Sequence, residues 1–135
     1  MPILSERSGY MLIIAAVLTV LVGLFHSIAG EIRLVRPLFK RPDLPSLGHG
    51  SWYVRALIRT AWHITTLTWW GIAAMLVVIH RAPLPDHVPL LWIISAVFAV
   101  SGVAALVLSR AKHPAWLAFL PIAGLTGLEA WMRAS

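Results

Sequence analysis

The chain contains no cysteine, which excludes disulfides, thiolate-bound metals, iron–sulfur clusters and thiol redox chemistry. A bound metal would need histidine, carboxylate or methionine ligands. Charged residues are also scarce, at 12% of the 135 residues, whereas soluble domains have about 25%. Acidic residues are the scarcest, with 5 Asp and Glu against 11 Lys and Arg. The composition therefore argues against a soluble domain.

Long apolar runs make up most of the chain. The hydrophobic fraction is 59%, the mean hydropathy is +0.83, and four runs cover residues 10–29, 61–79, 89–109 and 114–132. A helix needs about 20 apolar residues to cross about 30 Å of hydrocarbon, so each run is long enough to span a bilayer. The first run is too long for a signal-peptide core and lacks a convincing cleavage site, so we expect it to be retained.

These runs predict an all-α integral membrane four-helix bundle, built from two antiparallel transmembrane hairpins. We expect one transmembrane domain over residues 1–135, with helices over about residues 9–35, 51–80, 89–109 and 114–132. Pro37 is expected to end the first helix, and the proline- and glycine-rich stretch 37–50 is expected to be an irregular loop.

Basic residues gather in two of the connections. One side of the predicted bundle has Arg33, Arg36, Lys40, Arg41, Arg55, Arg59, Arg110 and Lys112, and the other side has Arg7, Arg81 and Arg133. Cytoplasmic connections carry the excess of Lys and Arg, so eight against three predicts that both termini face outward. Membrane topology explains the net charge of +6, and nucleic-acid binding is not expected.

Small and aromatic residues indicate where helices pack. Gly23 and Gly30 are about two turns apart, so they lie on one face of the first helix and allow close approach of another helix. Trp69 and Trp70 lie near the middle of the second run, a position that suits packing or a wall for a flat ligand.

Ionisable residues mark one end of the first predicted hairpin. His26 lies near the end of the first helix and His63 near the start of the second, so antiparallel packing predicts similar depth for both. Ser27 and Glu31 share a helix face at i+4, whereas His26 and Glu31 are about 140° apart on an ideal helix. Glu31 is therefore expected to join the histidines only if the helix bends near Gly30.

The favoured functional hypothesis is an accessory or ligand-binding membrane subunit whose basic cytoplasmic rim binds an anionic lipid or a similar group. Guanidinium groups bind phosphate through paired hydrogen bonds, and basic pockets between membrane helices bind lipid head groups. His63 or Glu31 would be available for proton transfer. The expected partners are membrane lipids, and other membrane subunits or a second copy of the chain are further candidates. The candidate site consists of His26, Glu31, Arg33, Arg55, Arg59, His63 and Arg110.

Two alternatives stay open. His26 and His63 are candidate ligands of a haem or a divalent metal in membrane redox chemistry, because imidazole is the commonest metal ligand. In a purely structural protein, Glu31 would instead pair with Arg33 or Arg59, and His26 would be hydrogen-bonded inside the bundle.

Sequence motifs do not decide whether the chain is an enzyme. It has no glycine-rich phosphate loop and no Gly-x-Ser-x-Gly elbow. Ser27 and His26 are neighbours that diverge by about 100° on a helix, so these two are not expected to form a nucleophile–base pair.

A short motif in the first hairpin resembles that of a known group. Residues 26–31 read His-Ser-Ile-Ala-Gly-Glu, and residues 59–63 read Arg-Thr-Ala-Trp-His. Together with Arg33, Pro37 and Leu38, they resemble small bacterial inner-membrane proteins with a His-Ser-x-x-Gly-Glu pattern. The resemblance covers the first hairpin better than the second and implies no activity. We expect a multi-pass protein of the bacterial inner membrane with both termini periplasmic.

Overall fold

A computed structural model describes all residues except Met1, Leu47 and His49, and it describes side chains from Tyr10 onward. The described part is helical and contains no strand. In chain order, the elements are α1 (Pro2–Gly30), a π-helix (Glu31–Val35), α2 (Arg36–Phe39), α3 (Ser51–Arg81), a short 3₁₀ helix (Pro85–His87), α4 (Val88–Leu108) and α5 (Trp116–Ala134). The predicted all-helical fold is therefore confirmed.

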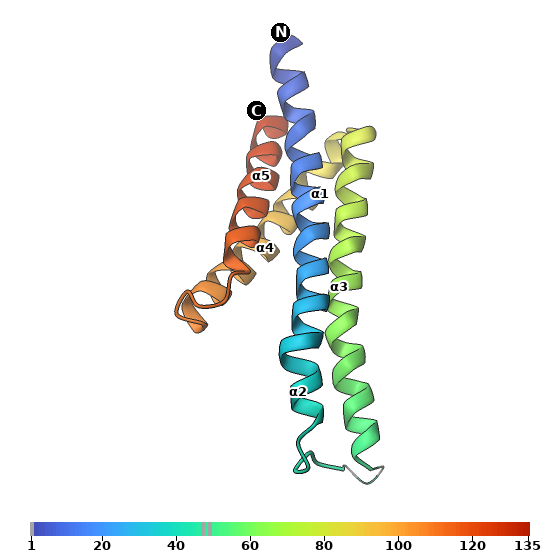
Figure 1. Cartoon of the computed structure of the whole chain (residues 1–135). Helices are drawn as coiled ribbons and strands as arrows, with labels where there is room; N and C mark the ends of the chain where they lie inside the picture. Colours follow the sequence, from blue (N-terminus) through green and yellow to red (C-terminus); the bar gives the residue numbers. More distant parts are fainter. Residues whose placement is uncertain (1, 47, 49) are drawn as a thin grey trace.

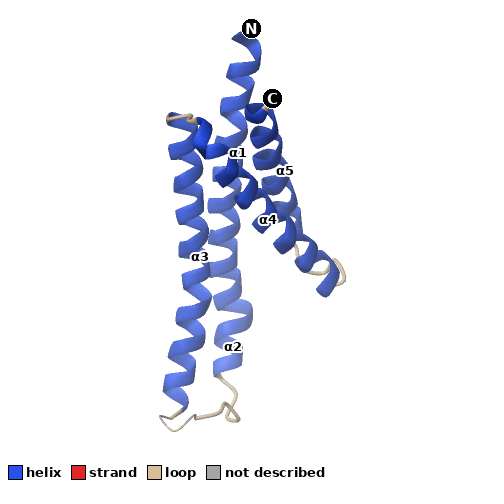
Figure 2. Ribbon diagram, turned by 180° about the vertical axis from the view of Figure 1, so that it is seen from behind, coloured by secondary structure: helices blue, strands red, loops and turns tan. Residues whose placement is uncertain are grey.

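The long helices form two hairpins (Figure 1). Helix α1, extended by the π-helix and α2, runs beside α3, and α4 runs beside α5. The hairpins meet mainly where α5 packs on α1. The α1–α3 hairpin extends well beyond the α4–α5 connection, and both views show this connection splayed away from α1 and α3 (Figures 1 and 2). The two chain ends lie at the same end of the molecule (Figure 1).

Three helical segments are long and apolar enough to cross a membrane. They are Tyr10–Phe39, Ser51–Arg81 and Pro85–Leu108. Helix α5 is not among them, and it contains the charged residues Glu129 and Arg133 in its second half. Length and hydropathy thus agree with a membrane protein.

The first helix is longer at both ends than the sequence predicts. It begins at Pro2 rather than near residue 9, and it does not end at Pro37. A π-helix precedes this proline, and the N–H of Arg36 donates to the carbonyl of Glu31 five residues back. Pro37 follows directly, in the first turn of α2, where its missing N–H is tolerated best. The helical path therefore continues to Phe39.

The apolar core lies towards the end of the molecule that carries the termini. Leu12, Leu76, Leu91, Phe98 and Ile122 are the largest apolar side chains that are fully buried there. Many large apolar side chains point outward on all four long helices, as a lipid-facing surface requires.

Small residues set the contact between α4 and α5. A Cβ atom added to Gly102 would lie 2.7 Å from Cδ2 of Leu120, and one added to Gly127 would lie 2.8 Å from the hydroxyl of Ser95. Ser95 donates a hydrogen bond of 2.8 Å to the carbonyl of Ala123. The two helices therefore approach closely, as small residues permit in membrane helices.

Candidate functional site

Two glycines of α1 provide the surface on which indole rings of α3 lie. A Cβ atom added to Gly30 would be only 2.3 Å from Cζ2 of Trp62, and one added to Gly23 would be 2.7 Å from Nε1 of Trp70. Trp70 also donates a hydrogen bond of 3.3 Å to the carbonyl of Val20. The glycine face was predicted to let another helix backbone approach closely, but the nearest atoms of α3 are side-chain atoms, mainly of the indole rings of Trp62 and Trp70.

His26 is held by two tryptophans of α3. Its imidazole stacks on Trp62, with ring centroids 4.2 Å apart and planes 7° apart, and meets the ring of Trp69 edge-on at 4.9 Å. Its Nε2 lies 3.3 Å from the carbonyl oxygen of Trp62, and the indole of Trp62 donates a bond of 3.1 Å to the carbonyl of His26. A carbonyl only accepts, so Nε2 of His26 carries a hydrogen.

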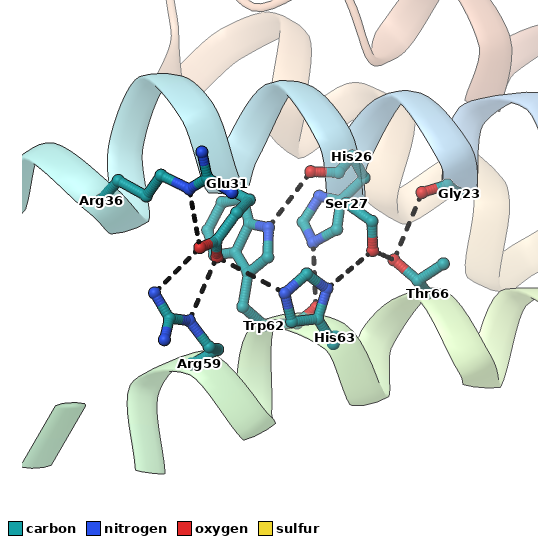
Figure 3. A network of polar contacts seen from close by, with 9 residues as sticks. All are labelled: Gly23, His26, Ser27, Glu31, Arg36, Arg59, Trp62, His63 and Thr66. Atoms are coloured by element: carbon teal, nitrogen blue, oxygen red, sulfur yellow. Dashed lines mark hydrogen bonds and ion pairs between the residues drawn. The ribbon is translucent and has the colours of Figure 1, made fainter. Parts of the chain in front are cut away.

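Glu31 is the centre of a group of charges at the start of the π-helix (Figure 3). Arg59 donates to its carboxylate from Nη2 at 2.8 Å and from Nε at 3.3 Å, and Arg36 donates from Nε at 3.3 Å. The Nε2 atom of His63 lies 3.5 Å from the same carboxylate. The predicted pair between Glu31 and Arg59 is therefore present, and Arg36 and His63 join it.

A line of hydroxyl groups continues from His63 into the space between α1 and α3 (Figure 3). The Nδ1 atom of His63 is 2.9 Å from the hydroxyl of Ser27, which is 2.8 Å from the hydroxyl of Thr66. The buried Thr66 hydroxyl is also 3.3 Å from the carbonyl of Gly23. Polar contacts thus connect the exposed charges to buried backbone.

The two predicted site histidines make separate sets of contacts. His26 contacts Trp62 and Trp69, whereas both ring nitrogens of His63 face other groups, namely Ser27 and Glu31. Glu31 lies one helical turn after Ser27 on the same face, and His63 of α3 faces both residues. The carboxylate therefore lies beside His63 and not beside His26.

His26 faces a cavity of about 530 Å³ between the two hairpins. Its walls are mainly apolar and aromatic, including Phe25, Trp69 and Phe119, and its polar lining residues are His26, Arg33 and His113. The Nδ1 atom of His113 accepts a hydrogen bond of 3.2 Å from the N–H of Ala115. From sequence, His113 was expected to join His26 only in a compact bundle, and it lines the same cavity as His26.

The remaining predicted arginines differ in their surroundings. Arg33 forms no hydrogen bond or ion pair with any residue that the structure describes, and it lines the cavity. The Nε atom of Arg55 is buried and has no hydrogen-bond partner among the described residues. Arg110 is exposed in the α4–α5 connection, where its φ of 52° places it in the left-handed region. Arg33 thus differs from Arg59, whose guanidinium donates to the carboxylate of Glu31.

One ion pair lies in the connection between α2 and α3. Arg41 donates to Asp43 from Nε at 2.9 Å and from Nη2 at 2.8 Å. These bonds hold the pKa of the Asp43 carboxyl below its ordinary value and raise the pKa of Arg41. Both side chains are exposed, so salt will weaken this pair.

No protein-family model, curated protein or solved structure matches this chain. Among the described residues, no group of three or more His, Asp or Glu side chains is arranged to hold a metal ion. The geometry of the cavity and of the Glu31 group is therefore the basis for a functional proposal.

Proposed function

We propose that the chain is a multi-pass membrane protein that binds an anionic amphiphile, such as an acidic lipid, in the cavity between its two hairpins. Arg33 would hold the head group, and the aromatic walls would hold the apolar part. The observation that carries the proposal is an arginine without a partner among the described residues, at the edge of a mainly apolar cavity of about 530 Å³.

The membrane setting follows from length, hydropathy and charge. Three helical segments can cross a bilayer, and both chain ends lie at one end of the molecule, which suits an even number of crossings. We take α5 as the fourth crossing, because Glu129 is fully buried and paired with Arg133 at 2.7 Å. The excess of Lys and Arg in the two basic connections favours periplasmic termini in a bacterial inner membrane.

The chemistry of the cavity suits an acidic head group better than a neutral one. Arg36 and Arg59 are already paired with the carboxylate of Glu31, whereas the guanidinium of Arg33 has no carboxylate partner among the described residues. A guanidinium in this position can form paired hydrogen bonds with a phosphate or carboxylate. The imidazoles of His26 and His113 add polar contacts at the same cavity.

Quenching of tryptophan fluorescence by brominated lipids tests the proposal. Trp62 and Trp69 line the cavity, so a brominated lipid bound there quenches them. We expect brominated phosphatidylglycerol to quench at lower mole fraction than brominated phosphatidylcholine in mixed micelles. Arg33→Gln should weaken phosphatidylglycerol binding by about tenfold, the loss of one charge-assisted hydrogen-bond pair of about 1.5 kcal/mol.

Arg81→Gln is the matched control. Arg81 is also an exposed arginine, but it lies at the opposite end of α3 and does not line the cavity. Its substitution should leave phosphatidylglycerol binding unchanged. Equal quenching by both lipids, or equal losses in Arg33→Gln and Arg81→Gln, would contradict a specific head-group site.

Haem or metal binding is a second candidate function, favoured by one observation. His26 and His113 line the same cavity, and Nε2 of His26 is bonded to a backbone carbonyl. Metal-bound histidines commonly make such a bond with their second nitrogen, which leaves the other nitrogen for the metal. A Soret band or stoichiometric metal in the purified protein, lost in His26→Ala, would support this function, and a colourless, metal-free protein would exclude it.

A further inference from the structure

Ser27, His63 and Glu31 are connected in the order that activates a serine nucleophile. The hydroxyl of Ser27 is 2.9 Å from Nδ1 of His63, and Nε2 of His63 is 3.5 Å from the carboxylate of Glu31. A nucleophile within hydrogen-bond reach of a base, with the base oriented by a third group, is the pattern of serine acyl-transfer sites on unrelated folds. Ser27 comes from α1, Glu31 from the π-helix that continues α1, and His63 from α3, and Figure 3 shows them in line.

We propose that Ser27 is a nucleophile, with His63 as its general base and Glu31 as the positioning residue, and that the site cleaves carboxylic esters of membrane lipids. This activity goes beyond the proposed function and uses different residues. None of the three residues lines the cavity that contains Arg33.

The neighbours of Glu31 hold it in a suitable place. Arg59 and Arg36 bind its carboxylate, which is 16% exposed, and Glu31 shares the helix face of Ser27, which His63 contacts. In this arrangement Nε2–H of His63 donates to Glu31, which leaves the lone pair of Nδ1 free to accept the hydroxyl hydrogen of Ser27. The hydroxyl of Thr66 is 2.8 Å from that of Ser27, and its single hydrogen also reaches the carbonyl of Gly23 at 3.3 Å.

His63 is the member of this group that faces the outer surface of the hairpin. Its side chain is 41% exposed, and Ser27 beside it is partly exposed. A shallow groove of about 360 Å³ is lined by His63 with Arg59, Ile64 and Leu67 of α3, whereas Ser27 lies next to the groove and does not line it. The groove thus has a cationic end and an apolar end, as the boundary between lipid head groups and acyl chains requires. The ester carbonyls of membrane lipids lie at this boundary.

The reaction proceeds in two balanced steps. In the first, the Ser27 oxygen attacks the ester carbonyl, Nδ1 of His63 takes the hydroxyl proton, and the C–O bond to the alcohol breaks as His63 returns the proton to the leaving alcohol. In the second, water attacks the acyl-serine with the same base and releases the fatty acid. Arg59 lines the groove, where the N–H groups that it does not donate to Glu31 can stabilise a negatively charged oxygen.

Labelling with an alkyl fluorophosphonate tests the proposal on the full chain in detergent micelles. This reagent phosphonylates activated serines, and the labelled residue is identified by peptide mass spectrometry. We expect one label, on Ser27. Ser95 is the internal control, because it is also a partly buried helix serine but donates to the carbonyl of Ala123 and has no histidine partner in the described part of the chain. An unlabelled Ser27, or equal labelling of Ser95, overturns the proposal.

Variants of the base and the positioning residue separate activation from simple exposure. His63→Gln keeps a hydrogen-bonding side chain but cannot take the proton, so labelling of Ser27 should be lost. Glu31→Gln should slow labelling by at least about tenfold, whereas Glu31→Asp should restore part of the rate because it keeps the charge. Hydrolysis of a p-nitrophenyl acyl ester in the same micelles should follow the same order. Labelling that is equal in wild type, His63→Gln and Glu31→Gln, with all three folded by circular dichroism, overturns the assignment.

Discussion

The imidazole of His26 lies flat on the indole of Trp62, and each ring is hydrogen-bonded to the other residue's backbone carbonyl. This reciprocal contact joins α1 to α3 beside the cavity. It is possible only because Gly30 leaves room for the indole ring.

Gly30→Ala should therefore destabilise the first hairpin. The added methyl group would overlap the rigid indole of Trp62, and overpacking of this kind costs about 1–3 kcal/mol. The midpoint of thermal unfolding in detergent should fall. Gly71→Ala is the control, because a Cβ atom at Gly71 meets nothing within 4 Å. Its midpoint should stay the same or rise, since alanine favours helix over glycine by about 1 kcal/mol. Equal effects in the two variants would show that Trp62 moves away freely.

Glu129→Ala should destabilise the second hairpin more strongly. Glu129 is fully buried, its carboxylate accepts a 2.7 Å bond from Nε of Arg133, and the Arg133 side chain is 16% exposed. Removal of one partner of a buried ion pair costs about 3–5 kcal/mol, whereas replacement of both by apolar residues is often neutral. The double variant Glu129→Met with Arg133→Leu should therefore unfold at a higher temperature than Glu129→Ala alone. If the double variant instead unfolds at a lower temperature than Glu129→Ala, the two charges stabilise the fold independently and not as a pair.

The Asp43 carboxyl should titrate below its ordinary pKa. Its pKa is lowered by the bonds from Arg41, so the pair stabilises the folded chain at pH values above the ordinary aspartate pKa. This contribution is lost as the pH falls through the lowered value. Carbon-detected NMR titration of Asp43 should show a higher pKa in Arg41→Gln and a smaller difference in high salt, because the pair is exposed. An unchanged pKa in Arg41→Gln would contradict this pairing.

The sequence predicted the helices because their signals are local. Apolar runs and turn-forming residues place α3 and α4 close to their predicted ranges, at Ser51–Arg81 and Val88–Leu108. The i+4 spacing of Ser27 and Glu31 correctly placed both on one face, and His63 contacts both. The face formed by Gly23 and Gly30 was also predicted as a place of close approach.

The site could be predicted only in part, because the prediction grouped residues by their angles on an ideal helix. On a regular helix Glu31 points about 140° away from His26, but it shares the face of Ser27, and His63 of α3 lies against that face. Residue spacing within one helix also does not show which residue of α3 packs on His26, and in the structure that residue is Trp62. His63 therefore belongs with Ser27 and Glu31, a grouping that no spacing within one helix contains.

By itself, the sequence predicted a helical chain with four segments able to cross a membrane, and length and hydropathy support three of the four. Both properties depend on residues close together in the chain. Only the tertiary structure decided which side chains meet. Helix α4 is apolar on all faces, so its pattern does not say where α5 packs or how far the two hairpins separate. The cavity lined by Arg33 and His113, and the line from Glu31 through His63 to Ser27, arise from contacts between distant segments.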